Sequence, residues 1–288
     1  MPSVQADKQV EAPIVDGHVH IGEGEIEPGR PGSLNAERLL ALMDGPFHLL
    51  GEQRRVDHVL AQPNIFMTRE GDPWDHHRYV AQAVAAHPSR ISGCFVCNPL
   101  LPVARTLEVL EDLVQSHGFR AVKLHPMGHW YAPVRMRREL EPVFRFAAEN
   151  ALPVIVHQGD PPYSHPTQLA PLIEEFPDVT FILAHLASQR LIMAPEAIYV
   201  ASKLDNVFLE TGWGSLPRVK EALATLDAGR LVFGSDCPIQ EIGSQLRVLE
   251  VLTWDPPIGI NLPREELNRI LGATLWSLMH GDPHSVAA

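Results

Sequence analysis

The feature that most constrains the fold of this chain is the regular alternation of short apolar runs with longer amphipathic segments. Eight runs are rich in Val, Ile, Leu and Phe, and most lack the strict polar alternation of a sheet with one face in water. We therefore expect eight strands buried on both faces. They are Ile14–His20, Val56–Pro63, Ile91–Asn98, Ala121–His125, Val154–His157, Thr180–His185, Val207–Glu210 and Leu231–Asp236.

The segments between these runs have the spacing and end signals of helices. Ser33 is a candidate N-cap for the first helix, and Gly118 is suited to end the third. The predicted helices are Leu34–Met43, Trp74–Ala86, Val103–Ser116, Arg138–Glu149, Pro166–Glu175, Ala194–Leu204, Leu216–Leu226, Glu241–Leu252 and Arg264–Met279. Alternating strands and helices predict a parallel sheet, and eight such units in 288 residues favour a closed (β/α)8 barrel over an open doubly wound sheet.

No linker, low-complexity tract or charge block divides the chain, so we expect one α/β domain over residues 1–288. Residues 1–11 are expected to form a loose N-terminal arm, and residues 281–288 a loose C-terminal tail. Long loops that follow the strands would distort the barrel and cover its C-terminal face, where barrel enzymes build their active sites. Three such loops stand out: Gly22–Gly32, Pro126–Arg135 and Gln158–Pro166.

Charge and cysteine content exclude several classes of protein. The net charge of −12, from 23 basic and 35 acidic residues, argues against nucleic acid or an anionic membrane as a partner. No run approaches about 20 apolar residues, so a membrane-spanning helix is not expected. Cys94 and Cys97 lie three apart on a predicted strand and would point to opposite faces, so they should not form a disulfide. These features predict a cytoplasmic protein.

Ionisable residues recur at the ends of the predicted strands. His18 and His20 are two apart, so on a strand both imidazoles point to one side and could bind a divalent transition metal. Burying many unpaired charges around one barrel mouth costs several kcal/mol each, and a bound cation removes that penalty. The further residues of this kind are Lys123, His125, His157, His185, Glu210 and Asp236.

Taken together, these motifs resemble those of the amidohydrolase superfamily. The resemblance rests on Asp16-Gly17-His18-Val19-His20, on the histidines that end the fifth and sixth runs, and on Gly234-Ser235-Asp236-Cys237-Pro238. More narrowly, the chain resembles the amidohydrolase-related branch, which includes aminocarboxymuconate-semialdehyde and resorcylate decarboxylases. The resemblance extends from about Ile14 to Leu278. It implies a metal-dependent barrel enzyme that acts on a small molecule as a homodimer.

The resemblance also assigns roles to individual residues. It implies that His18, His20, His157 and Asp236 bind one metal ion, Zn²⁺ or alternatively Mn²⁺. A water molecule on the metal would be activated, Asp236 would accept its proton, and His185 would polarise the substrate or orient the water.

Lys123 leaves the number of metal ions open. In the binuclear branch of the superfamily, a carbamylated lysine at a similar position bridges two metals. The alternative is an ammonium group neutralised by Glu210 or Asp16. We expect one ion, and two if Lys123 is carbamylated.

Four residues, His125, Trp130, Glu210 and Arg190, are the main candidates to contact the substrate, and Trp213 and Arg135 are two further ones. His125 lies nearer the barrel mouth than Lys123, and Trp130 lies in an aromatic loop that, with Trp213, could line a pocket. Glu210 could contact the substrate or anchor Lys123. Arg190 follows the sixth strand and could bind a carboxylate, as could Arg135 after the fourth.

These residues predict a hydrolase of a small organic amide, ester or lactone. The alternative is a nonoxidative decarboxylase of an aromatic or unsaturated acid, in which Asp236 would protonate the carbon. Decarboxylation needs a clamp on the carboxylate, and no arginine clearly ends a predicted strand, so hydrolysis is placed first. A more remote alternative is a noncatalytic barrel that binds a ligand.

Overall fold

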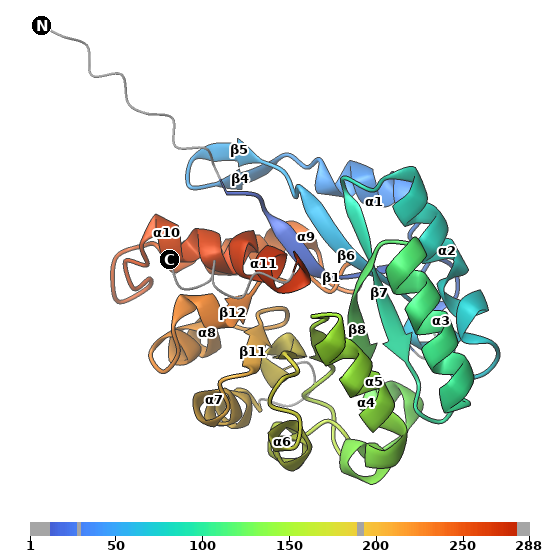
Figure 1. The fold of residues 1–288 in the computed structure, drawn as a ribbon. Helices are drawn as coiled ribbons and strands as arrows, with labels where there is room; N and C mark the ends of the chain where they lie inside the picture. The colour runs from blue at the N-terminus through green and yellow to red at the C-terminus, as the bar shows by residue number, and fades with distance from the viewer. Residues whose placement is uncertain (1–11, 28–29, 189–192, 281–288) are drawn as a thin grey trace, which may run out of the picture.

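The computed structural model describes residues 12–27, 30–188 and 193–280. Eight parallel strands form one nearly closed barrel in the order in which they occur along the chain. Most of the helices lie outside this ring (Figure 1). The predicted α/β barrel and all eight predicted strands are confirmed. The strands are β1 (Val15–Ile21), β6 (His58–Pro63), β7 (Ile91–Cys97), β8 (Phe119–Leu124), β9 (Val154–Val156), β10 (Phe181–Leu183), β11 (Val207–Glu210) and β12 (Leu231–Val232).

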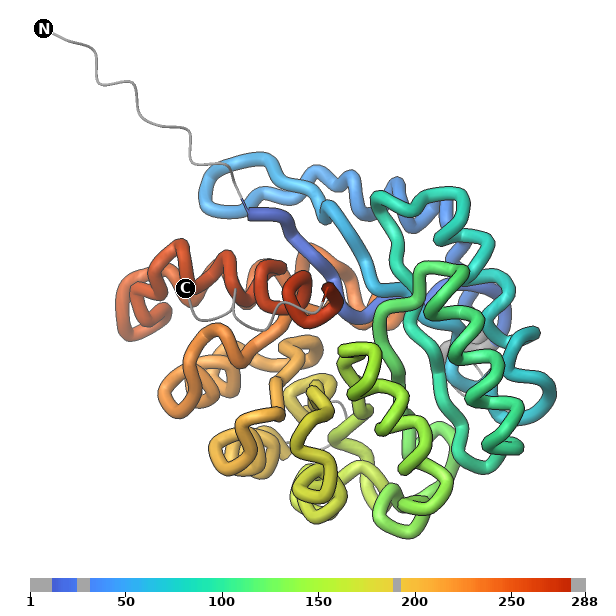
Figure 2. The backbone as a smooth tube through the Cα atoms, viewed as in Figure 1, coloured from blue at the N-terminus to red at the C-terminus, as the bar shows by residue number. Residues whose placement is uncertain are grey.

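The barrel closes where the chain returns from β12 to β1. The chain runs around the ring from the N-terminal blue to the C-terminal red, and the red segment lies beside β1 (Figure 2). The Gly17 N–H donates to the Phe233 carbonyl at 2.9 Å, and the Asp236 N–H donates to the His18 carbonyl, also at 2.9 Å. These bonds bring both ends of the sequence to one seam.

The helices agree with the predicted ones except at their ends. They are α1 (Ala36–Met43), α2 (Pro73–Ala86), α3 (Val103–Ser116), α4 (Pro126–His129), α5 (Arg137–Glu149), α6 (Pro166–Glu174), α7 (Ala194–Lys203), α8 (Leu216–Leu223), α9 (Ile242–Val251), α10 (Arg264–Asn268) and α11 (Thr274–His280). The helix predicted over Arg264–Met279 is interrupted by a π-helical turn, Arg269–Ala273. Each of these helices is too short or too polar to span a lipid bilayer.

The N-cap predicted at Ser33 is wrong. The Leu34 carbonyl accepts a hydrogen bond from the Gly22 N–H at 2.9 Å, so the chain is still extended there. The helix begins after Asn35, whose side-chain oxygen accepts from the Arg38 N–H at 2.8 Å. Two short antiparallel hairpins were not predicted. They are β2 (Glu25–Glu27) with β3 (Arg30–Pro31), and β4 (Phe47–Leu49) with β5 (Glu52–Arg54).

The barrel interior is built in two layers. In the lower layer each strand contributes one apolar or thiol side chain, and Leu275, Leu278 and Met279 of α11 pack against them. Cys94 belongs to this interior cluster and Cys97 to the outer one, which confirms that the two thiols point to opposite faces. The eight strand residues are Val15, Leu60, Cys94, Ala121, Ile155, Ile182, Phe208 and Val232.

The upper layer is polar because side chains alternate along each strand. Two residues beyond the apolar layer, four strands present Gln62, Lys123, His157 and Glu210, all of them buried. Since the strands are parallel, these polar side chains all lie at the C-terminal end of the barrel. The fold therefore concentrates its buried ionisable groups at one end.

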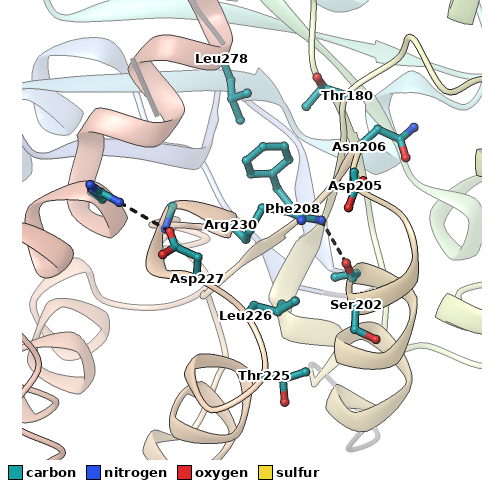
Figure 3. Close-up of a pocket in the computed structure, with 13 residues that line it drawn as sticks. Thr180, Ser202, Asp205, Asn206, Phe208, Thr225, Leu226, Asp227, Arg230 and Leu278 are labelled. Atoms are coloured by element: carbon teal, nitrogen blue, oxygen red, sulfur yellow. Dashed lines mark hydrogen bonds and ion pairs between the residues drawn. The ribbon is translucent and has the colours of Figure 1, made fainter. Parts of the chain in front are cut away.

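A cavity of about 790 Å³ opens at the opposite end of the barrel, where β10, β11 and β12 begin (Figure 3). Thr180, Asn206 and Arg230 line this cavity. The Arg230 guanidinium donates to the Ala201 carbonyl at 3.0 Å and to the Leu204 carbonyl at 2.8 Å. Arg230 therefore joins α7 to the sheet. Because the cavity lies where the strands begin, it is on the opposite side from the C-terminal face, where barrel enzymes bind their substrates.

His77 joins α2 to the outer surface of β7. Its Nδ1–H donates to the Pro73 carbonyl at 2.7 Å, and its Nε2 accepts from the Val96 N–H at 2.8 Å. The ring also stacks on Phe95. Burial lowers the pKa of His77 from 6.5 to about 3, so this imidazole stays neutral in the folded protein.

We predict that His77 makes the protein less stable as the pH falls below 6.5. The pKa of His77 in the folded protein is about 3, below the unfolded value of 6.5, so the unfolded chain takes up the proton first. This one group should lower the free energy of unfolding by about 2 kcal/mol between pH 7 and pH 5. His77→Gln can keep both hydrogen bonds and should lose correspondingly less stability in urea unfolding at the two pH values. An equal loss in both proteins would contradict this prediction.

Candidate metal centre

Two imidazoles and one carboxylate meet where β1 and β12 close the barrel. Nε2 of His20 lies 3.2 Å from Oδ1 of Asp236, and Nε2 of His18 lies 3.4 Å from the same oxygen. Possible ligand atoms of the three side chains lie within 4.8 Å of one another, and all three side chains are buried. The structure thus brings together three of the four residues predicted to bind the metal.

Neighbouring acceptors fix how these two histidines present their rings. His18 donates from Nδ1 to Oε2 of Glu210 at 3.1 Å, and His20 donates from Nδ1 to the Pro63 carbonyl at 3.3 Å. With the hydrogen on Nδ1, each ring keeps its lone pair on Nε2, the atom that faces Asp236. Histidines that bind metals are held in the same way, with one nitrogen bonded to an outer acceptor and the other free for the metal.

His157, the fourth predicted ligand, lies beside His185. Its Nε2–H donates to Oδ2 of Asp160 at 2.9 Å, and its Nδ1 lies 3.1 Å from Nε2 of His185. Asp160 therefore leaves the Nδ1 lone pair directed toward the other imidazoles. The role of His157 as a ligand stays a prediction.

Glu210 holds the other histidines in place. Its Oε2 accepts from the His185 N–H at 3.0 Å as well as from His18, and its Oε1 accepts from the Gly212 N–H. His18, His185 and Glu210 form a second buried group with ligand atoms within 4.8 Å of one another. Glu210 thus positions His18 and His185. That it also contacts the substrate stays a prediction.

Lys123 lies inside the same cluster. Its Nζ is 3.1 Å from Nε2 of His18, and the side chain is fully buried. Burial lowers the pKa of Lys123 to about 8, although Glu210 and Asp236 oppose that shift. The amine of Lys123 therefore offsets part of the negative charge of these two carboxylates within the polar layer.

The ionisation of the cluster suits a divalent cation. Burial lowers the pKa values of His18, His157 and His185, so these rings are neutral at pH 7. Burial alone would raise the pKa of Asp236, but the surrounding imidazoles hold it well below its usual value. Oδ1 of Asp236 is buried and accepts no hydrogen bond from any residue that the structure describes. Neutral imidazoles around an ionised, unsatisfied carboxylate oxygen are the donor set that such a cation requires.

Strained backbone surrounds this cluster. His185, Trp213 and Asp236 have φ values of 64°, 61° and 62°, in the left-handed region that non-glycine residues rarely adopt. Such residues cost about 1–3 kcal/mol each and persist where the surrounding contacts over-determine them. The Trp213 indole Nε1–H donates to Oδ2 of Asp236 at 2.7 Å, and its backbone N–H donates to Gln245 at 3.1 Å. Trp213, expected only to line a pocket, therefore orients Asp236.

The predicted substrate contacts occupy different places. The His125 ring stacks on His157 with 3.7 Å between centroids, and its Nδ1 accepts from the Gly128 N–H at 2.9 Å. Trp130 lies at the barrel mouth and is 64 % exposed. Arg190 lies outside the described residues, as do residues 1–11 and 281–288. The roles of these residues in binding substrate stay predictions.

Comparison with known proteins supports one family. A family model described as amidohydrolase matches residues 15–274 of the chain. No curated protein matches. An uncharacterised TIM-barrel protein from Bordetella bronchiseptica is similar in structure, with 17 % identity and a TM-score of 0.69 over 96 % of this chain and 99 % of that one.

Two decarboxylases are among the other similar structures. The 2,6-dihydroxybenzoate decarboxylase from Rhizobium has 14 % identity and a TM-score of 0.66 over 94 % of this chain and 99 % of that one. The 5-carboxyvanillate decarboxylase from Novosphingobium aromaticivorans, solved with manganese and a nitrobenzoic acid, has 13 % identity and a TM-score of 0.70 over 93 % and 96 %. At these identities the comparison demonstrates a shared fold.

We predict that Asp160→Asn weakens metal binding. The amide can no longer hold the Nε2 proton of His157 with a full negative charge, so Nδ1 becomes a poorer and less oriented donor. Loss of such an outer partner typically costs 10–100-fold in metal affinity. Equilibrium dialysis with Mn²⁺ or Zn²⁺ would measure the effect, with the exposed Asp178→Asn as control. An unchanged affinity in Asp160→Asn would contradict the prediction.

Proposed function

Because the chain belongs to the amidohydrolase family, we propose that it is a metal-dependent enzyme that removes CO₂ from an aromatic or unsaturated carboxylic acid without oxidation. The observation that carries the proposal is the buried His18, His20 and Asp236 cluster, set in a barrel whose similar structures include hydroxybenzoate decarboxylases. Hydrolysis was the first prediction from the sequence. The similar structures support the alternative, decarboxylation, better.

We propose that His18, His20, His157 and Asp236 hold one divalent cation, Mn²⁺ or Zn²⁺. Bound there, the cation would draw electron density from the substrate's carboxylate or from a hydroxyl group next to it. Lys123 then remains an amine beside His18 and places a positive charge within the cluster.

Proton delivery to carbon falls to Asp236. The bond between the carboxylate and its carbon breaks, CO₂ leaves, and the electron pair stays on that carbon, which takes a proton. Oδ1 of Asp236 faces the imidazoles, whereas Oδ2 is held by Trp213, so Oδ2 is the oxygen placed to pass a solvent proton. His185, whose backbone N–H is fixed by Glu210, orients the acid. The burial of these groups keeps bulk water from the carbon as it becomes negative.

Hydrolysis of an amide, ester or lactone is the second candidate. The matching family model is itself described as amidohydrolase, and the same residues could activate a water molecule. The two reactions differ in their products, so one set of assays separates them.

We predict release of CO₂ when the metal-loaded protein is incubated with 2,6-dihydroxybenzoate or 5-carboxyvanillate. In D₂O the product should carry one deuterium at the carbon that lost CO₂. Asp236→Asn should lower the rate by about 100-fold or more, the usual contribution of a positioned proton donor. No CO₂ release from these acids, together with hydrolysis of simple esters, lactones or amides at enzymatic rates, would reverse the order of the two candidates.

Trp213→Phe tests how Asp236 is positioned. Removing the indole N–H leaves Oδ2 without the hydrogen bond that orients it, and a hydrogen bond to a charged group is worth about 1.5–3 kcal/mol. We predict a fall in kcat of about tenfold or more with little change in KM or in bound metal. Trp276→Phe, on α11 at the other end of the barrel, is the matched control. Equal kcat values in the two variants would contradict the assignment.

A further inference from the structure

We propose that Arg69 is a specificity-determining residue at the barrel mouth, which binds a second acidic group of the substrate, remote from the carboxylate that is lost. This inference rests on the proposed function and names the substrate class as acids with two anionic groups. Arg69 lies in the loop after β6, directly behind the 3-10 helix Ile65–Thr68. It ends no strand, and so the prediction from strand ends did not include it.

The backbone at Arg69 is fixed from two neighbouring loops. Asn98, which follows β7, donates from its side-chain amide to the Thr68 carbonyl at 3.2 Å and to the Arg69 carbonyl at 3.0 Å. The Thr68 hydroxyl lies 2.8 Å from Nε2 of His129, in the loop after β8. Arg69 is therefore held over the C-terminal ends of three adjacent strands.

The guanidinium is also held in place. Its Cζ lies 4.4 Å from the ring centroids of both Phe66 and Trp130, and its Nε–H donates to the Gly128 carbonyl at 2.9 Å. Within the described part of the chain, no carboxylate pairs with Arg69. Its terminal nitrogens therefore keep the fork of donors that matches a carboxylate.

Trp130 is kept against Arg69 at an energetic cost. Its φ and ψ are 60° and 52°, the left-handed conformation that a bulky side chain rarely adopts. Although its side chain is largely exposed, the indole packs on the guanidinium instead of into the core. A strained residue that serves no core contact points to a functional constraint.

Arg69 is connected to the candidate metal centre through Gly128 and His125. Gly128 accepts from Arg69 through its carbonyl oxygen and donates through its backbone N–H to Nδ1 of His125, which stacks on His157. A Cβ at position 128 would lie 2.6 Å from Ile65 and 2.8 Å from His125, so glycine permits this close approach. Because Nδ1 of His125 accepts, its hydrogen is on Nε2, and His125 provides a second donor between Arg69 and the metal centre.

Charge explains why the mouth needs such a residue. The chain carries a net charge of −12, which disfavours the approach of an anion, so a fixed cation at the mouth assists binding of an acidic substrate. The carboxylate that is lost must lie among the imidazoles and Asp236. Arg69 is separated from them by Gly128 and His125, so it contacts a different acidic group of the same molecule.

Binding of benzene-1,3-dicarboxylate and benzoate to the metal-loaded protein tests the proposal without turnover. Calorimetry should show that the unaltered protein binds the dicarboxylate about tenfold or more tightly than benzoate. Arg69→Met should remove this preference. It should weaken binding of the dicarboxylate and change the affinity for benzoate by no more than about twofold. Arg69→Lys, which keeps the charge but loses the fork, should be intermediate. Arg145→Met, an exposed arginine on the outer helix α5 that pairs with Glu141, should behave as the unaltered protein.

The proposal is overturned if the unaltered protein binds neither acid, if it binds both equally, or if its preference survives in Arg69→Met. Melting temperature and metal content show whether Arg69→Met is folded, and Arg69→Lys gives the answer if it is not. A preference that depends on Arg69 in a protein that releases no CO₂ from any dicarboxylate would contradict the decarboxylase proposal alone. CO₂ release with no role for Arg69 would contradict the present proposal alone.

Discussion

The parallel contact between β1 and the chain that follows β12 is the interaction on which the rest of the structure depends. Val19 pairs with Cys237, and the His20 N–H donates to the Cys237 carbonyl at 2.8 Å. Oδ1 of Asp16 reinforces this seam by accepting from the Ser235 N–H at 2.8 Å. Without it the sheet would be open, and the two histidines of β1 would lie at the opposite edge from Asp236. Closure of the barrel therefore assembles the candidate metal centre.

The two interior layers have different roles: the lower layer stabilises the barrel, and the upper layer contains the candidate metal centre. The lower layer and α11 bury apolar side chains, which stabilises the barrel in the ordinary way. The upper layer buries imidazoles, carboxylates and one amine, each costly to remove from water. Glu210 and Asp160 reduce that cost by accepting hydrogen bonds from histidines, and the same bonds fix which ring nitrogens face inward. The hydrogen bonds that lower the cost of burying the polar layer thus also preorganise it for a cation.

The strands and the ligand candidates could be predicted from the sequence because both follow from local rules. Apolar runs mark buried strands, and a period of two places His18 beside His20 and Lys123 above Ala121. Trp213 and Asp160 could not be recognised in the same way. Their roles arise from a left-handed turn and from a loop that folds back on the histidine three residues before it. The helix cap is Asn35 and not the predicted Ser33. The backbone of Leu34 pairs with that of Gly22, twelve residues earlier, so the chain stays extended past Ser33 and the helix begins later than the residue types alone indicate.

The order of the two candidate reactions shows what reasoning from strand ends leaves out. Hydrolysis was placed first because no arginine clearly ended a predicted strand. A barrel mouth, however, is formed by loops as well as by strand ends, and the loop after β6 carries a guanidinium fixed by Phe66, Trp130 and Gly128. Its position depends on contacts among three loops, and no periodic pattern in the sequence encodes these. Counting the cations of a barrel site therefore requires the folded loops.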